Sequence, residues 1–325
     1  MSSSPLPVRI ASAALRPSLT RGAALRLAAA RSVGLVLVYH RVAPHGPSPH
    51  EVVPTLASSV FRAQVETLAR LGDIVPLADV LQPPRSTSRP RFAITFDDDH
   101  EGHVANVLPI LEDAGVRATF FLSGRSLHAL PAYWWVRLEE SIRRIGLAET
   151  AARLGLPART PEELGYGVEH SGTLERLCEL LPSAARADMP VDDIRTLARA
   201  GMTIGFHTLR HSRLSDLSGE RLDTALREGR SELEAAAKTP VTMLAYPYGR
   251  ATRETADAAA HAGYTAAFAS GGHPVNHLSD RYLLGRWDPG ASSGDAFAAN
   301  VTLRLLRTRT PSHTYPSRNH PSERG

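Results

Sequence analysis

Three consecutive carboxylates, Asp97-Asp98-Asp99, are followed by His100 and form the stretch of the sequence best suited to chemistry. They come directly after a β-prone apolar run, residues 91–96, so the acids are expected at the end of a buried strand. Adjacent carboxylates repel one another, and a divalent cation or a captured proton would offset that repulsion. The alternative is a solvated acidic loop that caps the next helix, because Asp is an ordinary N-cap residue.

Two histidines, His207 and His211, also follow a predicted strand, residues 202–206. Their spacing lets both imidazoles reach one metal ion. In a parallel barrel the carboxyl ends of the strands share one face, so these histidines are expected to meet the acidic run in space. Two histidines and one carboxylate leave coordination positions open, which is typical of a catalytic metal and not of a closed structural site.

Strands and helices alternate along most of the chain, which predicts an α/β fold with a parallel sheet. The predicted strands are residues 33–39, 73–77, 91–96, 116–122, 202–206, 241–245, 264–268 and one that ends near residue 287. The predicted helices include residues 104–114, 191–200, 218–237, 252–262 and 295–306.

Residues 123–190 interrupt this alternation with several amphipathic helices and the run Tyr133-Trp134-Trp135. We expect this segment to be a mainly helical insertion that caps one end of the barrel. Core packing of the cap explains the two tryptophans, and stacking against a sugar ring is the alternative.

Length and composition indicate one large domain with tails. The 325 residues are 42% apolar and 22% charged, as in a soluble globular protein. We assign residues 1–32 to a basic N-terminal extension, residues 33–306 to the barrel domain with its insertion, and residues 307–325 to a disordered tail. The net charge is +4 and no acidic residue precedes Glu51, so the basic excess belongs to the ends and we expect no nucleic-acid partner.

The cellular compartment is predicted from what the sequence lacks. Cys178 is the single cysteine, so an intrachain disulfide cannot form and no oxidising compartment is required. Arginines interrupt the apolar residues before position 32, and the longest clean apolar run, residues 33–39, is too short for a membrane span. We expect a cytoplasmic protein, with peripheral membrane contact through the basic N-terminus left open. No oligomeric state is predicted.

Three motifs resemble, in order and context, those of the polysaccharide deacetylase family of carbohydrate esterases: Thr95-Phe96-Asp97-Asp98, His207-Thr208-Leu209-Arg210-His211 and Tyr246-Pro247-Tyr248-Gly249. Residues 38–42, 118–122 and 285–287 extend the resemblance to about residues 33–290, apart from the insertion. It implies a distorted (β/α) barrel with about seven parallel strands. It also implies a divalent metal, usually zinc, and a hydrolase that removes acyl groups from N-acylated sugars in a glycan, glycolipid or glycoside.

The resemblance also implies roles for five residues. Asp97 matches the general base, while Asp98, His207 and His211 match the metal ligands. The backbone N–H of Tyr248 matches the donor that stabilises the developing oxyanion. A metal that activates water, with a carboxylate at hydrogen-bonding distance as base, suits amide hydrolysis.

Three departures from the family pattern concern the groups around this centre. Asp99 stands where the family usually has glycine. The arginine that often precedes the proline of the third motif is missing, and Arg286 is a candidate substitute for orienting the base. The late leucine-x-histidine motif that supplies the general acid is also absent, so His273, His277 and His103 are candidates for protonating the departing amine.

Another histidine, His40, ends the first predicted strand and is a further candidate for a functional role, whereas His45 and His50 fit a loop surface. Two other functions remain open at this point. One is a non-catalytic carbohydrate-binding relative that kept the fold and the metal pocket. The other is a barrel metallophosphoesterase, which would need bridging ligands for a second metal.

Overall fold

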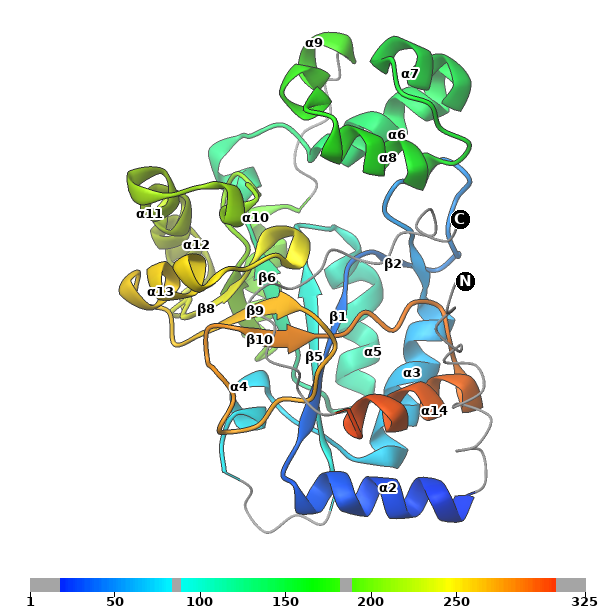
Figure 1. Cartoon of the computed structure of the whole chain (residues 1–325), viewed down its shortest axis with the longest axis vertical. Helices are drawn as coiled ribbons and strands as arrows, with labels where there is room; N and C mark the ends of the chain where they lie inside the picture. The colour runs from blue at the N-terminus through cyan, green and yellow to red at the C-terminus, as the bar shows by residue number, and fades with distance from the viewer. Residues whose placement is uncertain (1–17, 84–88, 182–188, 308–325) are drawn as a thin grey trace, which may run out of the picture.

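The computed structural model describes residues 18–83, 89–181 and 189–307. Its centre is a ring of parallel strands that runs up the middle of the molecule (Figure 1). The strands of the main sheet are β1 (Gly34–Tyr39), β4 (Asp73–Ile74), β5 (Arg91–Asp97), β6 (Thr119–Leu122), β7 (Thr203–Phe206), β8 (Met243–Ala245), β9 (Ala266–Ser270) and β10 (Leu284–Arg286). A separate pair, β2 (Val42–Ala43) and β3 (Leu56–Ala57), lies beside it.

Seven strands of the described chain follow one another in the order β1-β5-β6-β7-β8-β9-β10, and β4 joins the side of β5. The ring nearly closes because Leu37 of β1 forms a parallel bridge with Trp287, next to the end of β10. Backbone bonds from the Val38 N–H to the Trp287 carbonyl (2.9 Å) and from the Trp287 N–H to the Val36 carbonyl (2.8 Å) make this bridge. The predicted distorted barrel of about seven parallel strands is confirmed.

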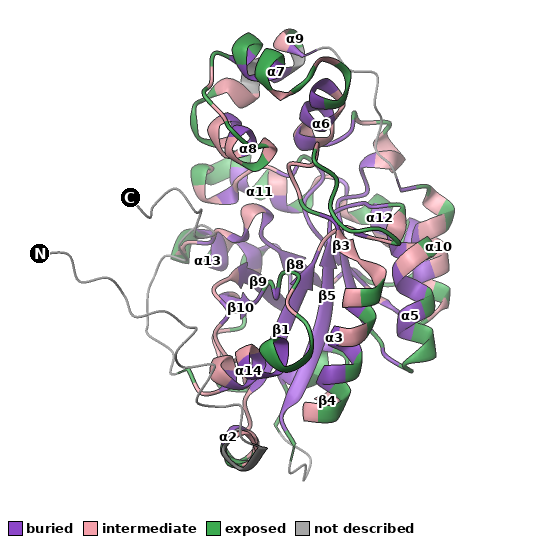
Figure 2. Cartoon of the chain, turned by 90° about the vertical axis from the view of Figure 1, so that its right-hand side faces the viewer, coloured by how far each residue is buried: buried purple, intermediate pink, exposed green. Residues whose placement is uncertain are grey.

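Two apolar clusters hold the barrel together, one on each face of the sheet. Side chains that point inward, such as Val36, Ala93, Phe121 and Phe268, fill the interior. The opposite faces of the same strands pack against the surrounding helices in a larger cluster. The strands are therefore buried on both faces, as Figure 2 shows for β1 and β5, which agrees with their continuous apolar sequences.

Helices surround the ring on the outside, except α4 (Leu77–Val80), whose Leu77 and Val80 pack with the interior side chains. The outer helices are α2 (Ser18–Ala30), α3 (Ser58–Leu71), α5 (Leu108–Asp113) with a preceding π-helical turn η1 (His103–Val107), α10 (Val191–Arg199), α11 (Gly219–Arg227), α12 (Arg230–Ala237), α13 (Arg253–His261) and α14 (Gly294–Leu305). Short 3₁₀ turns are η4 (Leu214–Asp216) and η5 (Pro247–Gly249).

The segment between β6 and α10 is helical and lies above the carboxyl ends of the strands (Figure 1). It contains η2 (Arg125–His128), α6 (Trp134–Ile145), α7 (Leu147–Leu154), α8 (Pro161–His170), η3 (Thr173–Arg176) and α9 (Leu177–Leu180). Its apolar side chains, among them Leu138, Ile142 and Leu164, form a cluster separate from the two barrel clusters. The insertion thus has a small core of its own.

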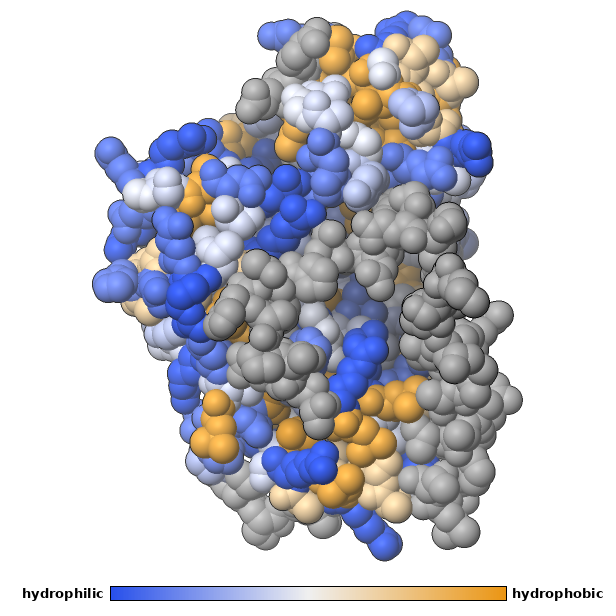
Figure 3. Space-filling view, in the orientation of Figure 1, coloured by the Kyte–Doolittle hydropathy of each residue, from blue (hydrophilic) through white to orange (hydrophobic). Residues whose placement is uncertain are grey.

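Helix α2 falls within the stretch assigned to an N-terminal extension, yet it packs against α14 near the end of the domain. Ala28 is fully buried in the outer barrel cluster, and Arg21 lies 3.4 Å from the Asp295 carboxylate. In Figure 3 apolar residues show around this corner and on the insertion, whereas hydrophilic residues cover α11 and α13. Residues 1–17, and the predicted tail apart from residue 307, lie outside the described residues.

The single helix predicted for residues 218–237 is wrong, because the chain forms α11 and α12 with a break between them. Gly229 has a φ of 82°, and a Cβ there would lie 3.1 Å from the Leu209 Cβ. Glu228 is non-helical and its carboxylate pairs with Arg210 at 2.6 Å. Packing against the loop that carries the site histidines therefore overrides the local helical preference. No helix in the described ranges is long and apolar enough to cross a membrane.

Candidate active site

The acidic run lies at the carboxyl end of β5 and is buried. Asp97 and Asp98 are each 3% exposed and Asp99 is 2% exposed, so a solvated capping loop is excluded. The Arg286 guanidinium at the end of β10 contacts both oxygens of Asp97, at 2.6 Å each. Burial acts to raise the pKa of the Asp97 carboxyl, but the charges of Arg286 and then His207 outweigh it and hold that pKa well below its usual range. Arg286 thus takes the orienting position for which the sequence made it a candidate.

Asp98, His207 and His211 converge on one point beside this pair. The Asp98 Oδ1 lies 3.6 Å from the Nε2 of His207 and 3.5 Å from the Nε2 of His211. Ligand atoms at about 2.0–2.2 Å from a tetrahedral metal are about 3.3–3.6 Å apart. All three ligand atoms lie within 4.8 Å of one another, so a small side-chain rotation brings the set into that range. These residues fit a single divalent ion.

Both histidines are held in a form that can bind a metal. The Nδ1 of His207 lies 2.9 Å from the Ala245 carbonyl, so Nδ1–H donates to this oxygen and leaves the Nε2 lone pair facing Asp98. Burial lowers the pKa of His207 and brings that of His211 well below its ordinary value. A neutral imidazole is the state that ligates a metal.

The backbone around this centre is strained. Asp98, Thr208, His211 and Tyr248 all have positive φ values, of 70°, 58°, 51° and 60°. Non-glycine residues adopt this region at a cost of about 1–3 kcal/mol each, and such residues cluster at functional sites. Two of these residues, Asp98 and His211, supply side chains to the cluster, and no pattern of apolar residues in the sequence reveals the strain.

Asp99 has a structural role that the sequence left open. Its carboxylate accepts hydrogen bonds from the Ser123 N–H (2.8 Å), the Ser123 hydroxyl (2.5 Å) and the Arg125 N–H (3.2 Å). The Tyr133 hydroxyl donates to the Ser123 Oγ at 3.1 Å, and the Tyr133 ring stacks on Trp135. Asp99 therefore ties the end of β5 to the start of the insertion. In the sequence, this role is indicated by an aspartate at the position where the family usually has glycine.

His103, a candidate for the general acid, is not among the residues that line the pocket. His103 is fully buried between the rings of Phe96 and Phe120, and its Nε2 lies 3.0 Å from the Asp98 carbonyl. Burial lowers the pKa of His103 to about 4. We conclude that His103 supports the Asp98 loop from below, which does not suit it to donate a proton to a leaving group in the pocket.

The other two candidates for the general acid come from the loop after β9. His273 is half-buried beside Gly285 at the start of β10, and His277 is exposed. Neither lines the pocket described below. Neither candidate therefore shares with His211 the pocket in which a leaving group would lie.

His40 lies beside the centre by strand register, although it is not among the residues that line the pocket either. The parallel register pairs Tyr39, the last residue of β1, with Phe96 of β5, so His40 follows in step with Asp97, the last residue of β5. After burial and nearer charges, the pKa values of Asp97 and His211 also respond to charge on His40. His40 is half-buried, in contrast to the enclosed His103. The sequence alone did not single it out as a proton donor because strand register is needed to place it.

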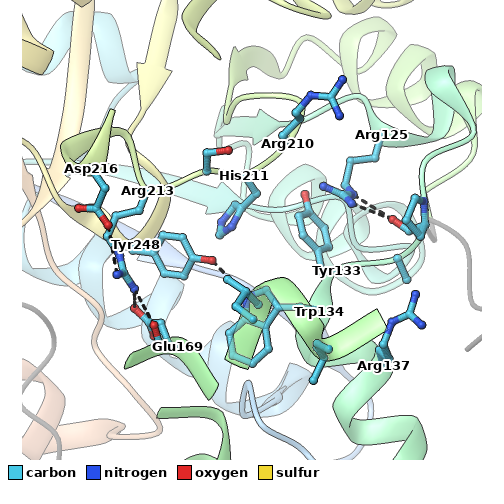
Figure 4. A pocket seen from close by; sticks show the side chains of 15 residues that line it. Arg125, Tyr133, Trp134, Arg137, Glu169, Arg210, His211, Arg213, Asp216 and Tyr248 are labelled. Atoms are coloured by element: carbon cyan, nitrogen blue, oxygen red, sulfur yellow. Dashed lines mark hydrogen bonds and ion pairs between the residues drawn. The ribbon is translucent and has the colours of Figure 1, made fainter. Parts of the chain in front are cut away.

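A pocket of about 400 Å³ opens between the insertion and the loops that carry the site. Figure 4 shows His211 facing into it together with Tyr133, Trp134 and Tyr248. The Trp134 Nε1–H donates to the Tyr248 hydroxyl at 3.1 Å, so insertion and barrel meet across the pocket. Trp135 is 3% exposed and packs in the cap, as expected, whereas Trp134 is half-buried and lines the pocket.

The fold and site define a class, that of deacetylase-like barrels with one Asp-His-His centre. The chain is similar to the Streptococcus pyogenes deacetylase PplD, solved in complex with acetate, at 17% identity over 85% of this chain and 99% of that one, with a TM-score of 0.55. It is also similar to IcaB from Ammonifex degensii at 16% identity, over 84% and 97% of the two chains, with a TM-score of 0.53. At these identities the likeness concerns the fold.

The family follows from the sequence match. The sequence model of the polysaccharide deacetylase family covers residues 85–267, more than half of the chain, and the chain belongs to this family. A curated relative, the putative polysaccharide deacetylase YxkH of Bacillus subtilis, is 22% identical over 224 residues, which span 68% of this chain and 60% of YxkH. The family is one of carbohydrate hydrolases that act on amide bonds, in agreement with the class of enzyme expected from the motifs.

Proposed function

We propose that the protein is a metal-dependent hydrolase that removes an N-acetyl group from an amino sugar, with zinc as the metal. The observation that carries this proposal is the pairing of Asp97 with Arg286 directly beside the Asp98, His207 and His211 cluster, whose His211 lines a pocket. One ionised base and one ligand set at the same strand end are what hydrolysis of an amide by activated water requires.

Each residue has a distinct task in this proposal. Asp98, His207 and His211 would hold the ion, which when bound supplies a Lewis acid for the carbonyl and lowers the pKa of water. Asp97 accepts the proton of the attacking water, and the Arg286 fork fixes the direction of its carboxylate. The Tyr248 N–H is the donor we assign to the developing oxyanion, and the positive φ of Tyr248 sets its orientation.

The departing amine needs a proton, and we assign its delivery to His40. His40 is in register with Asp97 on the neighbouring strand and is half-buried, whereas His103 is enclosed by aromatic rings. His40→Gln is expected to lower kcat for acetate release about 10²- to 10⁴-fold while the bound metal is unchanged. Loss of activity in His273→Gln with His40→Gln unaffected would contradict this assignment.

The central experiment is Asp97→Asn, compared with the wild-type protein for acetate release from N-acetylated oligosaccharides and for metal content by mass spectrometry. We expect turnover to be abolished and the metal to stay, because Asp97 is a base and not a ligand. Asp113→Asn, an exposed change on α5, is the control. Full activity in Asp97→Asn, or a wild-type enzyme without a metal requirement, would overturn the proposal.

The same assay separates the two alternatives. A non-catalytic sugar-binding relative would bind oligosaccharides without any saturable release of acetate. A two-metal phosphoesterase would need a second ion about 3.5–4 Å from the first. In the described residues one cluster of at least three ligands is present, which favours the single-metal hydrolase.

A further inference from the structure

Charge is distributed unevenly around the pocket. Four arginines line it, Arg125, Arg137, Arg210 and Arg213, against two carboxylates. On one side Arg213 is neutralised by Glu169 at 2.8 Å and by Asp216 at 3.4 Å, and Figure 4 shows this group beside Tyr248. Arg210 pairs with Glu228 outside the pocket. The remaining two arginines lie on the other side, beyond Tyr133.

These two arginines are buried without a carboxylate partner among the described residues. Arg125 is 8% exposed, donates to the Pro131 and Leu209 carbonyls, and lies over the Tyr133 ring. Arg137 is 9% exposed and donates from Nη1 to the Leu181 carbonyl at 2.9 Å. A guanidinium has five N–H donors, so Arg137 in particular has several that no described residue accepts.

A buried guanidinium is normally paired with an anion, because its charge is expensive to remove from water. Carbonyl oxygens satisfy hydrogen bonds but leave the net charge in place. Arginine also forms its strongest contacts as a two-pronged donor to a carboxylate or a phosphate. The side of the pocket next to Arg137 and Arg125 is therefore prepared for an anionic group.

The aromatic side chains of the pocket show what would carry that group. In Figure 4 Trp134 lies between Tyr248 and Arg137, and its Nε1–H is tied to the Tyr248 hydroxyl, which gives a fixed apolar surface of the kind against which sugar rings pack. A sugar that presents its amide to the centre at His211 would extend over this surface toward Arg137.

We propose that the pocket selects an N-acylated sugar that bears a negative charge, a phosphate or a carboxylate, on the same or the adjoining residue, with Arg137 as the main determinant and Arg125 beside it. This inference rests on the proposed deacetylase function for its substrate class. The recognition of the anion does not itself depend on hydrolysis, so it can be tested separately.

The first test measures binding of sugars that have no amide to hydrolyse. Calorimetry on the metal-loaded full chain would compare methyl glucoside with methyl glucuronide and glucose 1-phosphate. We expect at least one of the anionic sugars to bind at least tenfold more tightly than the neutral one, and the advantage to shrink as salt is added. The better of the two identifies the anion as carboxylate or phosphate. Equal binding of all three would overturn the proposal.

The second test uses variants on one helix. Arg137→Gln should lose the advantage of the anionic sugar, Arg137→Lys should retain part of it because it keeps the charge without the fork, and Arg143→Gln, exposed on the same helix α6, should bind as the wild type does. Anion preference that survives in both Arg137 variants would overturn the assignment to Arg137.

The third test is kinetic and compares N,N′-diacetylchitobiose, called chitobiose below, with a hyaluronan tetrasaccharide and with N-acetylglucosamine 1-phosphate. In Arg137→Gln, KM should rise at least tenfold for the preferred acidic substrate, with little change in kcat or in hydrolysis of chitobiose. Anion binding without hydrolysis of any substrate would refute the deacetylase function and leave the anion site standing. Hydrolysis with a preference for the neutral sugar would refute the anion site and leave the deacetylase function standing.

Discussion

The two sides of the pocket are built in different ways. The barrel side consists of strand ends, where Asp97 and Arg286 are fixed by a sheet that is buried on both faces. The insertion side consists of short helices around a small separate core, and it presents aromatic and cationic side chains such as Trp134 and Arg137. Ionisable groups suited to bond cleavage lie on the rigid side, and groups suited to recognition lie on the helical side.

This difference implies that the catalytic step and the selectivity for substrate can be altered separately in this fold. Changes at the strand ends should appear in kcat and metal content, whereas changes in the insertion should appear in KM. The following variants test that division, from the largest expected effect to the smallest.

Asp98→Ala should remove both metal and activity, because the two histidines alone leave the ion without its only charged ligand in the cluster. Metal content by mass spectrometry and acetate release check this, with exposed His261→Ala on α13 as the control. A variant that keeps a full equivalent of metal would show that Asp98 is not a ligand. It would also contradict the assignment of metal binding to the strand ends.

Arg286→Met should cost about 3–5 kcal/mol of unfolding free energy, because it leaves the buried Asp97 carboxylate without its ion pair. Chemical denaturation measures the loss. Arg253→Met removes an arginine whose pair with Asp280 lies at the surface, and it should cost less than about 1 kcal/mol. Equal losses in the two variants would mean that the strand end is less rigid than the contacts indicate.

Asp99→Ala should cost about 1–3 kcal/mol, since three donors lose a buried acceptor. The same variant should raise KM more than it lowers kcat, because Tyr133 loses its support through Ser123. Denaturation and steady-state kinetics check both expectations, with the exposed Asp113→Ala for comparison. A change in kcat alone would show that Asp99 acts with the catalytic groups of the barrel side and not with the insertion.

Tyr248→Phe is the mildest change, because it removes one hydroxyl and keeps the backbone N–H. Loss of the hydrogen bond from Trp134 is expected to cost about 0.5–1.5 kcal/mol, or up to about tenfold in KM, without affecting metal content. Tyr282→Phe, which removes a hydroxyl bonded to the Tyr264 carbonyl and away from the pocket, should leave KM unchanged. A large fall in kcat would show that the hydroxyl takes part in the reaction.

The barrel side was predictable from the sequence, and the insertion side was not. Asp98, His207 and His211 follow apolar parallel strands. The carboxyl ends of such strands share one face of a barrel, so topology alone places the three residues on that face. Arg286 could be named as a substitute partner of Asp97 because it also ends a strand. Arg125 and Arg137 belong to helical segments, and Tyr133 precedes α6. The packing of these segments on one another is tertiary, and no spacing along the chain reveals that the three residues share a pocket.

Two other features required coordinates for a different reason. His40 owes its place to a register between strands that are far apart in the sequence, and a shift by one residue would turn it to the other face. The break between α11 and α12 arises where Gly229 meets Leu209, so helical propensity within 218–237 could not forecast it. In both cases a long-range contact decides what local preference leaves open.

A carboxylate of the insertion holds the loop that follows His40, beside the packing of Val52 on the insertion core. Glu139 of α6 lies 3.1 Å from the Arg41 guanidinium and accepts the N–H groups of Val52 and Val53 at 2.9 and 3.2 Å. The insertion is therefore not an independent module that a protein engineer can exchange at its two chain junctions. A grafted insertion must bring an acceptor to the position of Glu139. Without one, two amides lose their acceptor, Arg41 keeps among the described residues only the longer contact with Glu51, and the backbone next to the proposed proton donor is loosened.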